Sequence, residues 1–450
     1  MPLAELVRRN SRLAERAFVV VLLATFAIVS IQYTLKALEV RDGKQARSAI
    51  LRWREQLVML DDGENIYVKH NYPNPPIMAL LLRPLADMPP LAGALTWFYL
   101  KVGMVLATFA MTFWLVEEHG RPFPAWAKGL TVVLSMRPIL GDLTHGNVNL
   151  FILFLVVASL AAFRRKWDLT AGVLIALAAA CKVTPALFIG YFLWKRAWRT
   201  LAAVALGLLL FFVVVPAAAL GWHANAELLG SWTQQMVTPF LVGGVVTSEH
   251  HNQSLPGLIH RLLTVSPSFS TYVNDVYTPT KYHNLAALDA STAGGLVKGC
   301  MLLFAVAVVL CCRTPIMRRA RAALSAEFAV VALGMLLFSE RTWKHHAVTL
   351  LLPFAVMCYG LAVGGSRSRL RAWLAGTVVA AQVLMTSTST GLLPDEWAKL
   401  GQVYGAFTWA FLLLVAALFV GLHRGSFDAA EPTGEAGALA NQDGRANRAA

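Results

Sequence analysis

The sequence predicts an all-α polytopic membrane protein, a bundle of about 10–12 transmembrane helices. Three observations lead to this fold class: 57% of the 450 residues are hydrophobic, only 14% are charged, and long apolar runs recur along the chain. Soluble domains carry about 25% charged residues, and a helix needs about 20 mostly apolar residues to cross a bilayer. A membrane barrel would instead show alternating apolar and polar residues.

The first apolar run, residues 18–30 with their flanks, follows a basic N-terminal segment at residues 1–16. Positive charge is retained on the cytoplasmic side, so we expect this segment to be cytoplasmic. No small-residue cleavage site follows the run, and we therefore expect a retained first helix. Later apolar runs cover residues 91–116, 150–163, 201–220, 301–310, 328–338, 347–363, 373–385 and 404–420.

Short basic loops alternate with less basic ones along the chain, which explains the net charge of +14 without a nucleic-acid partner. Residues 169–194 lie between two basic loops and must therefore enter the membrane and return. Each arm has about a dozen residues, too few to cross about 30 Å of hydrocarbon. We predict a re-entrant or broken helical hairpin with Lys182 near its tip. The alternative is one long helix whose Lys182 extends to the membrane boundary.

Two long external loops complete the predicted membrane domain, which covers residues 17–422. They span residues 32–76 and 221–295, and each carries short amphipathic stretches. Residues 46–60 show one apolar helical face and could lie flat on the membrane surface. Residues 77–88 follow several prolines and predict a short helix at the outer boundary. Residues 423–450 are small and polar, which predicts a disordered cytoplasmic tail.

The residues able to carry chemistry all fall in loops on the external side. Asp42 follows the first span closely and could act as a general base. The alternative is an ordinary turn before Gly43. Asp61 and Asp62 also precede a glycine, which makes an even stronger turn signal. The chain shows no nucleotide-binding or metalloprotease motif in a credible context, so a lipid-borne substrate fits this face better.

A second group lies in one short turn and suits the hydroxyl groups of a sugar or acceptor. It comprises Asp142, His145, Asn147 and Asn149. The alternative is a capped loop, in which one of the two asparagines begins the next helix. Lys182 is a cation at membrane depth, and a lipid phosphate would explain it. The alternative there is a structural pair with Asp142 or a backbone carbonyl.

The remaining candidates cluster in two runs of basic, amide and aromatic residues. For the donor phosphate we select Arg261, Arg341 and Lys344 beside Lys182. For the sugar or acceptor we select His251, Asn252, Gln253, His345 and His346. The histidines form adjacent pairs, whose side chains point apart, so we expect no metal site.

Several short strings, taken in order, resemble glycosyltransferase family 87. They lie at residues 65–67, 72–76, 83–85, 146–149, 171–172, 181–185 and 251–255. The resemblance covers roughly residues 15–420. Members of this family are polytopic enzymes of the C-type glycosyltransferase superfamily and use a polyprenyl-phosphate sugar.

The resemblance implies transfer of a hexose, typically mannose, to a lipid or glycan acceptor on the outer face of a prokaryotic inner membrane. It places a base in the first external loop, which falls on Asp42, and implies inversion. The family's Lys-x-x-Pro pattern matches Lys182 and Pro185, and its Asn-Gln-Ser pattern begins at Asn252. Because the lipid-linked donor is itself a substrate, we expect no cofactor, and no obligatory protein partner is implied.

Two departures from the family pattern leave alternatives open. The usual Gly-Gln-x-Asn is replaced by a string with Asn147 in its second position. The first loop lacks an unambiguous acidic signature, so Asp61, Asp62 and Asp142 rival Asp42 as the base. An O-antigen polymerase or ligase, which takes a diphosphate-linked oligosaccharide, is one rival function. A secondary transporter with the Lys182 hairpin as its site is the other.

Overall fold

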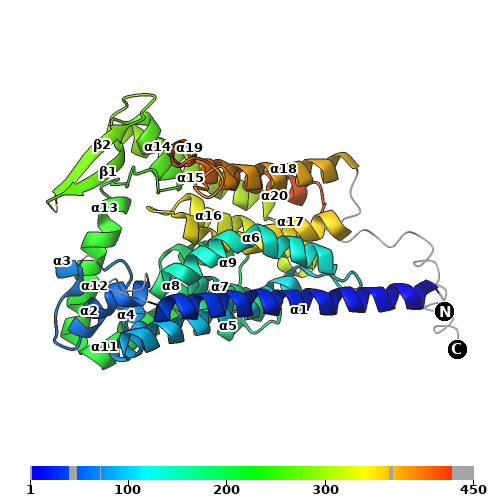
Figure 1. Ribbon diagram of the computed structural model, residues 1–450, viewed down its shortest axis with the longest axis horizontal. Coiled ribbons are helices and arrows are strands. Elements are labelled where there is room, and N and C mark those ends of the chain that lie inside the picture. Colours follow the sequence, from blue (N-terminus) through cyan, green and yellow to red (C-terminus); the bar gives the residue numbers. More distant parts are fainter. Residues whose placement is uncertain (1–2, 40–47, 71, 275, 364–367, 428–450) are drawn as a thin grey trace.

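The computed structural model describes residues 3–39, 48–70, 72–274, 276–363 and 368–427. Within them the chain forms an elongated helical bundle whose long axis follows α1 (Leu3–Leu38), as Figure 1 shows. The end of the bundle where α1 begins is called the terminal end here. The other end, where α1 finishes and the loop helices gather, is called the loop end.

Six helical segments of the described chain are long and apolar enough to cross a membrane, which confirms a polytopic helical protein. They are Ser11–Leu38, Pro90–Val116, Trp198–Leu220, Ala290–Cys311, Lys344–Val363 and Ala406–His423. The bundle also contains helices that are shorter or more polar. These are α6 (Ala125–His145), α7 (Asn149–Arg164), α16 (Arg321–Leu337) and α18 (Ser368–Thr386). Six segments of the described chain therefore qualify as spans, and the expected number of about 10–12 transmembrane helices stays a prediction.

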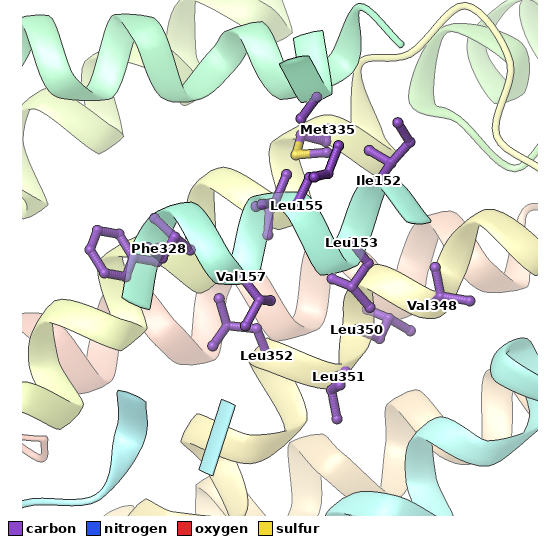
Figure 2. Packing of buried hydrophobic residues seen from close by; sticks show 14 of the residues in the cluster. Ile152, Leu153, Leu155, Val157, Phe328, Met335, Val348, Leu350, Leu351 and Leu352 are labelled. Carbon is purple, nitrogen blue, oxygen red and sulfur yellow. The ribbon is translucent and has the colours of Figure 1, made fainter. Parts of the chain in front are cut away.

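Burial separates interior helices from peripheral ones. α16 is buried along almost its whole length, and 78% of the most apolar window of Lys344–Val363 is buried. In α1 and α15 (Ala290–Cys311) only 6% of that window is buried. Leu153 of α7, Phe328 of α16 and Leu351 of α17 (Leu351–Val363) belong to the central core in Figure 2. Helices that are apolar all round and little buried by protein face lipid instead.

The predicted hairpin is present and its arms are α8 (Asp168–Cys181) and α9 (Leu187–Trp194), joined through the 3₁₀ turn η1 (Thr184–Ala186). Both feet lie at the terminal end, where Arg164 donates to the carbonyl of Leu115 and Lys195 to that of Cys312. At about 1.5 Å per residue, neither arm can cross about 30 Å of hydrocarbon. The chain therefore enters and returns, with Lys182 at the break.

Small residues let α8 lie directly against α10 (Trp198–Leu209). A Cβ atom at Gly172 would stand 2.4 Å from the carbonyl oxygen of Thr200, and one at Gly207 would stand 2.6 Å from the Ala176 Cβ. Glycine and alanine allow such close backbone approach between membrane helices. The hairpin is therefore held by helix packing on α10.

The terminal end contains a buried ionic cluster around Glu327 of α16. Its carboxylate accepts from Arg319 Nε at 2.7 Å, from Lys195 Nζ at 2.6 Å and from the Tyr191 hydroxyl at 2.7 Å. Lys195 also donates to the carbonyls of Cys312 and Thr314, at 2.6 and 2.8 Å. The three donors of this ammonium group are therefore all engaged.

Loop one forms α2 (Ala49–Met59), α3 (Ile66–His70) and α4 (Pro76–Asp87), so both short helices predicted there exist. The apolar face predicted for residues 46–60 is present, since Ile50 and Leu57 are fully buried. It packs inside the protein, against α4 and α5 (Pro90–Val116), and Arg54 donates to the carbonyl of Ala86 at 3.0 Å. The expectation that this helix lies flat on the membrane is therefore wrong, because protein already covers the apolar face.

Loop two contains α12 (Trp222–Trp232), the π-helical turn η3 (Thr233–Val237), α13 (Thr238–Leu241) and α14 (Leu255–Leu263). It also contains an antiparallel hairpin of β1 (Pro267–Val273) and β2 (Val276–Tyr282). Short helices were predicted in this loop and are present; the β-hairpin was not anticipated. β-branched and aromatic residues flank Asn274, whose φ of 51° suits a tight turn, and this pattern is the usual sequence signal for a β-hairpin. The 3₁₀ turn η4 (Ile316–Arg318) lies at the terminal end and α19 (Asp395–Val403) at the loop end.

Loop two is fastened to a membrane helix at a backbone irregularity. Between α10 and α11 (Val215–Leu220) the chain makes a π-helical turn, η2 (Leu210–Val214), and Pro216 follows. Proline lacks the N–H that would bond to the carbonyl four residues earlier. The Asn225 amide of α12 donates to that carbonyl, of Phe212, at 3.0 Å. Asn65 of loop one in turn donates to Ser231 of α12 at 2.8 Å.

Candidate functional site

The site is built around the turn between α6 and α7. Gly146 ends α6 with a φ of 67°, a conformation that favours glycine. A Cβ atom there would stand 2.4 Å from the Ser48 Oγ, where α2 begins. The indole of Trp97, on α5, donates to the Gly146 carbonyl at 2.7 Å. The turn is thus fixed between the first loop and α5.

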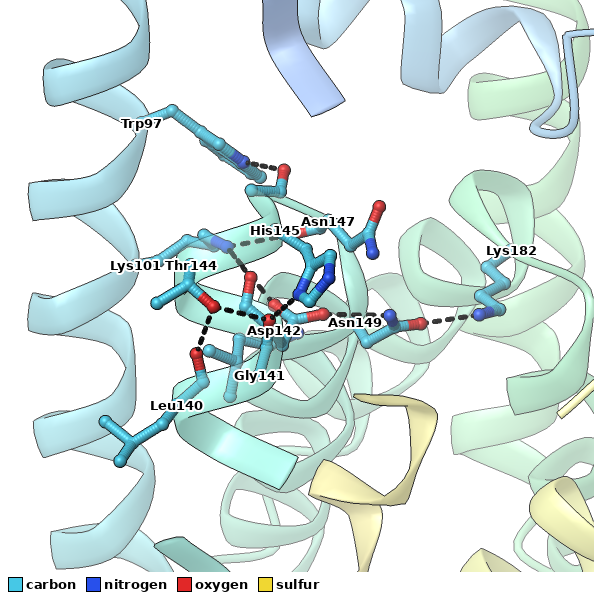
Figure 3. Close-up of polar contacts among 12 residues, drawn as sticks. Trp97, Lys101, Leu140, Gly141, Asp142, Thr144, His145, Asn147, Asn149 and Lys182 are labelled. Atoms are coloured by element: carbon cyan, nitrogen blue, oxygen red, sulfur yellow. Dashed lines mark hydrogen bonds and ion pairs between the residues drawn. The ribbon is translucent and has the colours of Figure 1, made fainter. Parts of the chain in front are cut away.

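A fully buried ion pair lies beneath this turn. Lys101 of α5 donates to Asp142 Oδ1 at 3.2 Å, to the Asp142 carbonyl at 2.7 Å and to the Asn147 carbonyl at 3.1 Å. Neither side chain is exposed at all. Figure 3 shows the ammonium group reaching the end of α6 from the neighbouring helix. The cation lies where the carbonyl groups of α6 have no helical partner, a favourable place for positive charge.

A chain of side chains leads from this pair to the hairpin tip. Asn149 donates through Nδ2 to Asp142 Oδ2 at 2.8 Å, and its Oδ1 accepts from Lys182 Nζ at 2.6 Å. Figure 3 shows the three side chains in a row. In the described chain the Lys182 ammonium group makes this one hydrogen bond, to Asn149, and takes part in no ion pair. Two of its three donors therefore remain for a ligand.

The Lys182 ammonium lines a pocket between α7, α16 and the start of α17. Its polar lining is Asn149, Lys182, Thr184, Ser339, Thr342, His346 and Thr349. The remaining walls are apolar: Ile152, Leu153, Val156, Val157, Ala332, Met335, Leu336 and Leu352. A pocket with an apolar floor and a cationic rim suits an amphiphile that carries an anionic group.

Three further cations at the loop end do not line the pocket and bond to uncharged acceptors in the described chain. Arg52 donates to the Asn147 side chain at 3.4 Å, Lys344 to the Thr388 carbonyl at 2.7 Å and Arg137 to the Met385 carbonyl at 2.6 Å. The imidazoles of His145 and His345 stack with ring centres 5.7 Å apart. The structure thus brings the turn, the hairpin tip and the residues around Lys344 together at the loop end.

The Asn252–Gln253 segment is placed differently from the prediction. Gln253 is buried and donates to the carbonyls of His250 and Gln402, at 2.6 and 2.8 Å. Asn252 is buried too and donates to the carbonyls of Thr247 and Glu340, at 2.8 and 2.9 Å. Both amides therefore hold loop two to the neighbouring loops, whereas the preceding His251 is exposed.

Arg261, selected for the donor phosphate, is also fully buried. Its guanidinium donates to five backbone carbonyls, those of Ser248, Glu249, Asn252, Gln402 and Val403. Burial among these groups lowers the pKa of Arg261 to about 9. These contacts make it a structural cation, because its fully buried guanidinium is surrounded by backbone carbonyls and Arg261 does not line the pocket. Arg341 is exposed and donates to the Thr247 hydroxyl at 2.7 Å.

The structure describes three of the four carboxylates proposed as the base. Asp42 lies outside the described residues. Asp61 pairs with Arg83 at the surface, and Asp62 is exposed. Asp142 is fully buried, both of its carboxylate oxygens accept hydrogen bonds, and it does not line the pocket. Its contacts suit a structural acceptor better than a base.

Sequence reasoning missed Lys101. The signal was available, because a lysine inside an apolar span is rare and marks a functional position by default. Among the residues that the structure describes, no group of three His, Cys, Asp or Glu side chains is placed to hold a metal ion. That metal plays no part stays a prediction.

Fold and site together define a multi-pass membrane protein with a mostly apolar pocket, lined by one lysine, at one end of its bundle. Residues 72–340 match the model of glycosyltransferase family 87, and the chain belongs to this family. It is therefore a membrane glycosyltransferase, and the transporter alternative is not supported.

Curated relatives of the chain are mannosyltransferases. It is 27% identical, over 78% of its length and 76% of the relative's, to a polyprenol-phosphate-mannose-dependent alpha-(1-2)-phosphatidylinositol mannoside mannosyltransferase of Mycolicibacterium smegmatis. The protein of the same name in Mycobacterium tuberculosis is 28% identical over 76% of this chain and 75% of its own. A polyprenol-phosphate-mannose-dependent alpha-(1-2)-phosphatidylinositol pentamannoside mannosyltransferase of Mycolicibacterium smegmatis is 27% identical over 76% of this chain and 73% of its own length.

Solved structures of ArnT from Cupriavidus metallidurans are similar at a lower level. The apo structure has a TM-score of 0.40 and 14% identity, covering 90% of this chain and 77% of that one. The structure bound to undecaprenyl phosphate has a TM-score of 0.39 and 15% identity, covering 91% and 78%. Scores this low do not place individual residues of the present chain.

Proposed function

We propose that this glycosyltransferase moves mannose from a polyprenyl-phosphate donor to a lipid or glycan acceptor at the loop end of the bundle. The observation that carries the proposal is Lys182, a half-buried ammonium group with one neutral partner beside an apolar pocket. A phosphate monoanion with a hydrocarbon tail matches both features. The three curated relatives depend by name on the same class of donor.

The loop end would face the exterior of a prokaryotic inner membrane. The basic residues that precede the first apolar run support this orientation, since positive charge is retained on the cytoplasmic side. The names of the relatives support a phosphatidylinositol-type glycolipid as the acceptor class.

In the proposed reaction a carboxylate deprotonates the acceptor hydroxyl, and the oxygen attacks the anomeric carbon. The bond to the phosphate oxygen breaks on the opposite face, which inverts the configuration. Lys182 would stabilise the charge that develops on the leaving phosphate. We assign the base to Asp42, because Asp142 is enclosed by its partners.

Substitution of single carboxylates tests the base. Asp42→Asn should reduce transfer by about 10²–10⁴-fold, the range typical of general base catalysis, with unchanged expression. Asp62→Asn, which removes an exposed carboxylate of the same loop, is the matched variant. Near-normal turnover by purified Asp42→Asn, together with loss in Asp62→Asn or Asp61→Asn, would reassign the base.

The donor class is tested by supplying two lipids to the same purified protein. Polyprenyl-phosphate mannose should support transfer, and a diphosphate-linked oligosaccharide should not. Transfer from the diphosphate donor alone would favour an O-antigen polymerase or ligase activity and would contradict the proposal.

A further inference from the structure

We propose that Lys101 is a positioning residue of the transfer site. Through its ion pair with Asp142 it fixes the orientation of the Asn149 amide, and through that amide it presents Lys182 to the pocket. The inference rests on the proposed function, in which Lys182 holds the donor phosphate.

The first step is the complete engagement of Lys101. Its ammonium group has three donors, and the structure supplies three acceptors within 3.2 Å: one oxygen of the Asp142 side chain and two backbone carbonyls. Nothing of Lys101 is exposed, so it does not itself contact a ligand. A buried carboxylate stays ionised only when a partner compensates its charge, and Lys101 is that partner.

The second step is the effect of that charge on Asn149. An ionised carboxylate accepts hydrogen bonds and cannot donate one. The Asn149 amide must therefore direct its NH₂ group to Asp142, and the 2.8 Å contact agrees with this. The two polar atoms of an amide lie on opposite sides, so its oxygen then faces Lys182 at 2.6 Å. A reversed amide would direct N–H groups at an ammonium group and repel it.

The third step concerns charge. Lys101 forms the ion pair with Asp142, and no acid of the described chain lies within ion-pair distance of Lys182 beside the pocket. The Leu150 N–H, at the start of α7, adds a further contact to Asp142 at 3.4 Å. The arrangement thus orients Lys182 through a neutral amide and leaves it without an acidic partner in the described chain.

The experiment compares two variants of the purified, full-length enzyme. Lys101→Met leaves Asp142 buried without its partner, and we expect a lower Tm and a rise of about tenfold or more in donor KM, the loss expected for a charged hydrogen bond. Lys101→Met/Asp142→Asn removes both charges and should recover the Tm. Its donor KM should stay raised, because an amide at position 142 can donate as well as accept and no longer fixes Asn149. A merely structural pair would recover both quantities together.

Asn149→Leu keeps the ion pair and removes only the connecting amide. It should raise the donor KM by a similar factor and lower the Tm less than Lys101→Met does, because Asp142 loses one donor but keeps its ion pair. If Lys101→Met does not fold, this variant still tests the connecting amide, and a normal donor KM overturns the inference. Lys195→Met, which breaks a buried ion pair at the terminal end, is the control: it should lower the Tm and leave the donor KM unchanged.

A binding measurement with polyprenyl phosphate in detergent micelles tests this inference and the proposed function separately. No saturable binding by the wild-type protein would contradict the proposed donor. Binding that Lys182→Met abolishes and that Lys101→Met/Asp142→Asn leaves unchanged would keep the donor and overturn the role of Lys101. Weakened binding in the double variant supports it.

Discussion

The two ends of the bundle each contain a buried cluster of ionic groups, and the two clusters differ in how completely their cations are bonded. At the terminal end, Lys195 gives all three of its donors to Glu327 and two carbonyls. At the loop end, Lys182 gives one donor to an uncharged amide in the described chain. The hairpin connects them, with Lys182 at its tip and Lys195 at its foot.

This difference distinguishes the cluster around Glu327, which stabilises the fold, from the cluster around Lys182, which can bind a ligand. Burial of a charge is tolerated when partners surround it, as at Glu327, and such a cluster contributes to the fold alone. A cation that keeps free donors beside a pocket has an energetic reason to bind an anion. The number of ammonium N–H groups without a partner in the described chain thus distinguishes Lys182 from Lys195 more clearly than burial does.

The largest effect expected is on stability at the terminal end. Glu327→Gln leaves Lys195 and Arg319 buried without an acid, and we expect a loss of about 3–5 kcal/mol in the free energy of unfolding. Thermal unfolding in detergent measures it. The remaining folded enzyme should keep its donor KM; a changed KM would show that the terminal-end cluster also serves the site.

Lys182→Met should show the opposite pattern. We expect kcat/KM for the donor to fall by about 10²–10³-fold, as when one preorganised donor to a developing anion is removed. Its Tm should stay close to that of the wild type. Steady-state kinetics with the donor varied, beside a thermal melt, measures both, and a large loss of Tm with normal kinetics would mean that the comparison is wrong.

The contact between α8 and α10 sets the position of the hairpin that joins the clusters. Gly172→Ala brings a Cβ against the backbone of α10, and we expect a loss of about 1–3 kcal/mol, as for overpacking. Gly190→Ala is the matched control, since nothing lies within 4 Å of a Cβ there. Equal melting temperatures for the two variants would show that the hairpin is held in another way.

The smallest effect concerns pH at the loop end. Burial, followed by the nearby His251, lowers the pKa of His250 to about 3. The folded state therefore binds fewer protons than the unfolded state below an unfolded pKa of about 6.5, so stability falls as the pH drops through that value. The contribution lost is roughly 1.4 kcal/mol at pH 5.5. The Tm of His250→Asn should decline less between pH 7.5 and 5.5, and an equal decline would refute the assignment.

Much of the fold could be predicted because membrane constraints act on local sequence. The lengths of the apolar runs and the charges of the loops between them predict membrane-spanning helices. The short arms on either side of Lys182 predict the hairpin. The β-hairpin at β1–β2 was missed although Asn274 marks its turn, because a loop between spans gives weak periodicity. The burial of α2 could not be predicted, since an apolar helical face does not reveal whether lipid or protein covers it.

Only part of the candidate site could be predicted, because Arg261, Asn252 and Gln253 lie in structural contacts outside the pocket. Asp142, Asn149 and Lys182 do come together, as polar residues at one boundary should. Their relative arrangement depends on Lys101, which is distant from them in the sequence. Its contact with Asp142 forms only when α5 packs beside α6. Arg261 could equally serve a phosphate or a set of carbonyls, and only the folded arrangement of loop two distinguishes the two.

The bond from Asn225 to the π-helical turn has a mechanical consequence. Loop two is joined through it to a membrane helix, and loop one is joined to loop two through Asn65. Both loops therefore have an attachment beside Pro216 in addition to their other contacts, in a helix that supplies no residue to the pocket lining. A stretch of backbone outside the pocket thus couples the two outer segments to each other and to a membrane helix.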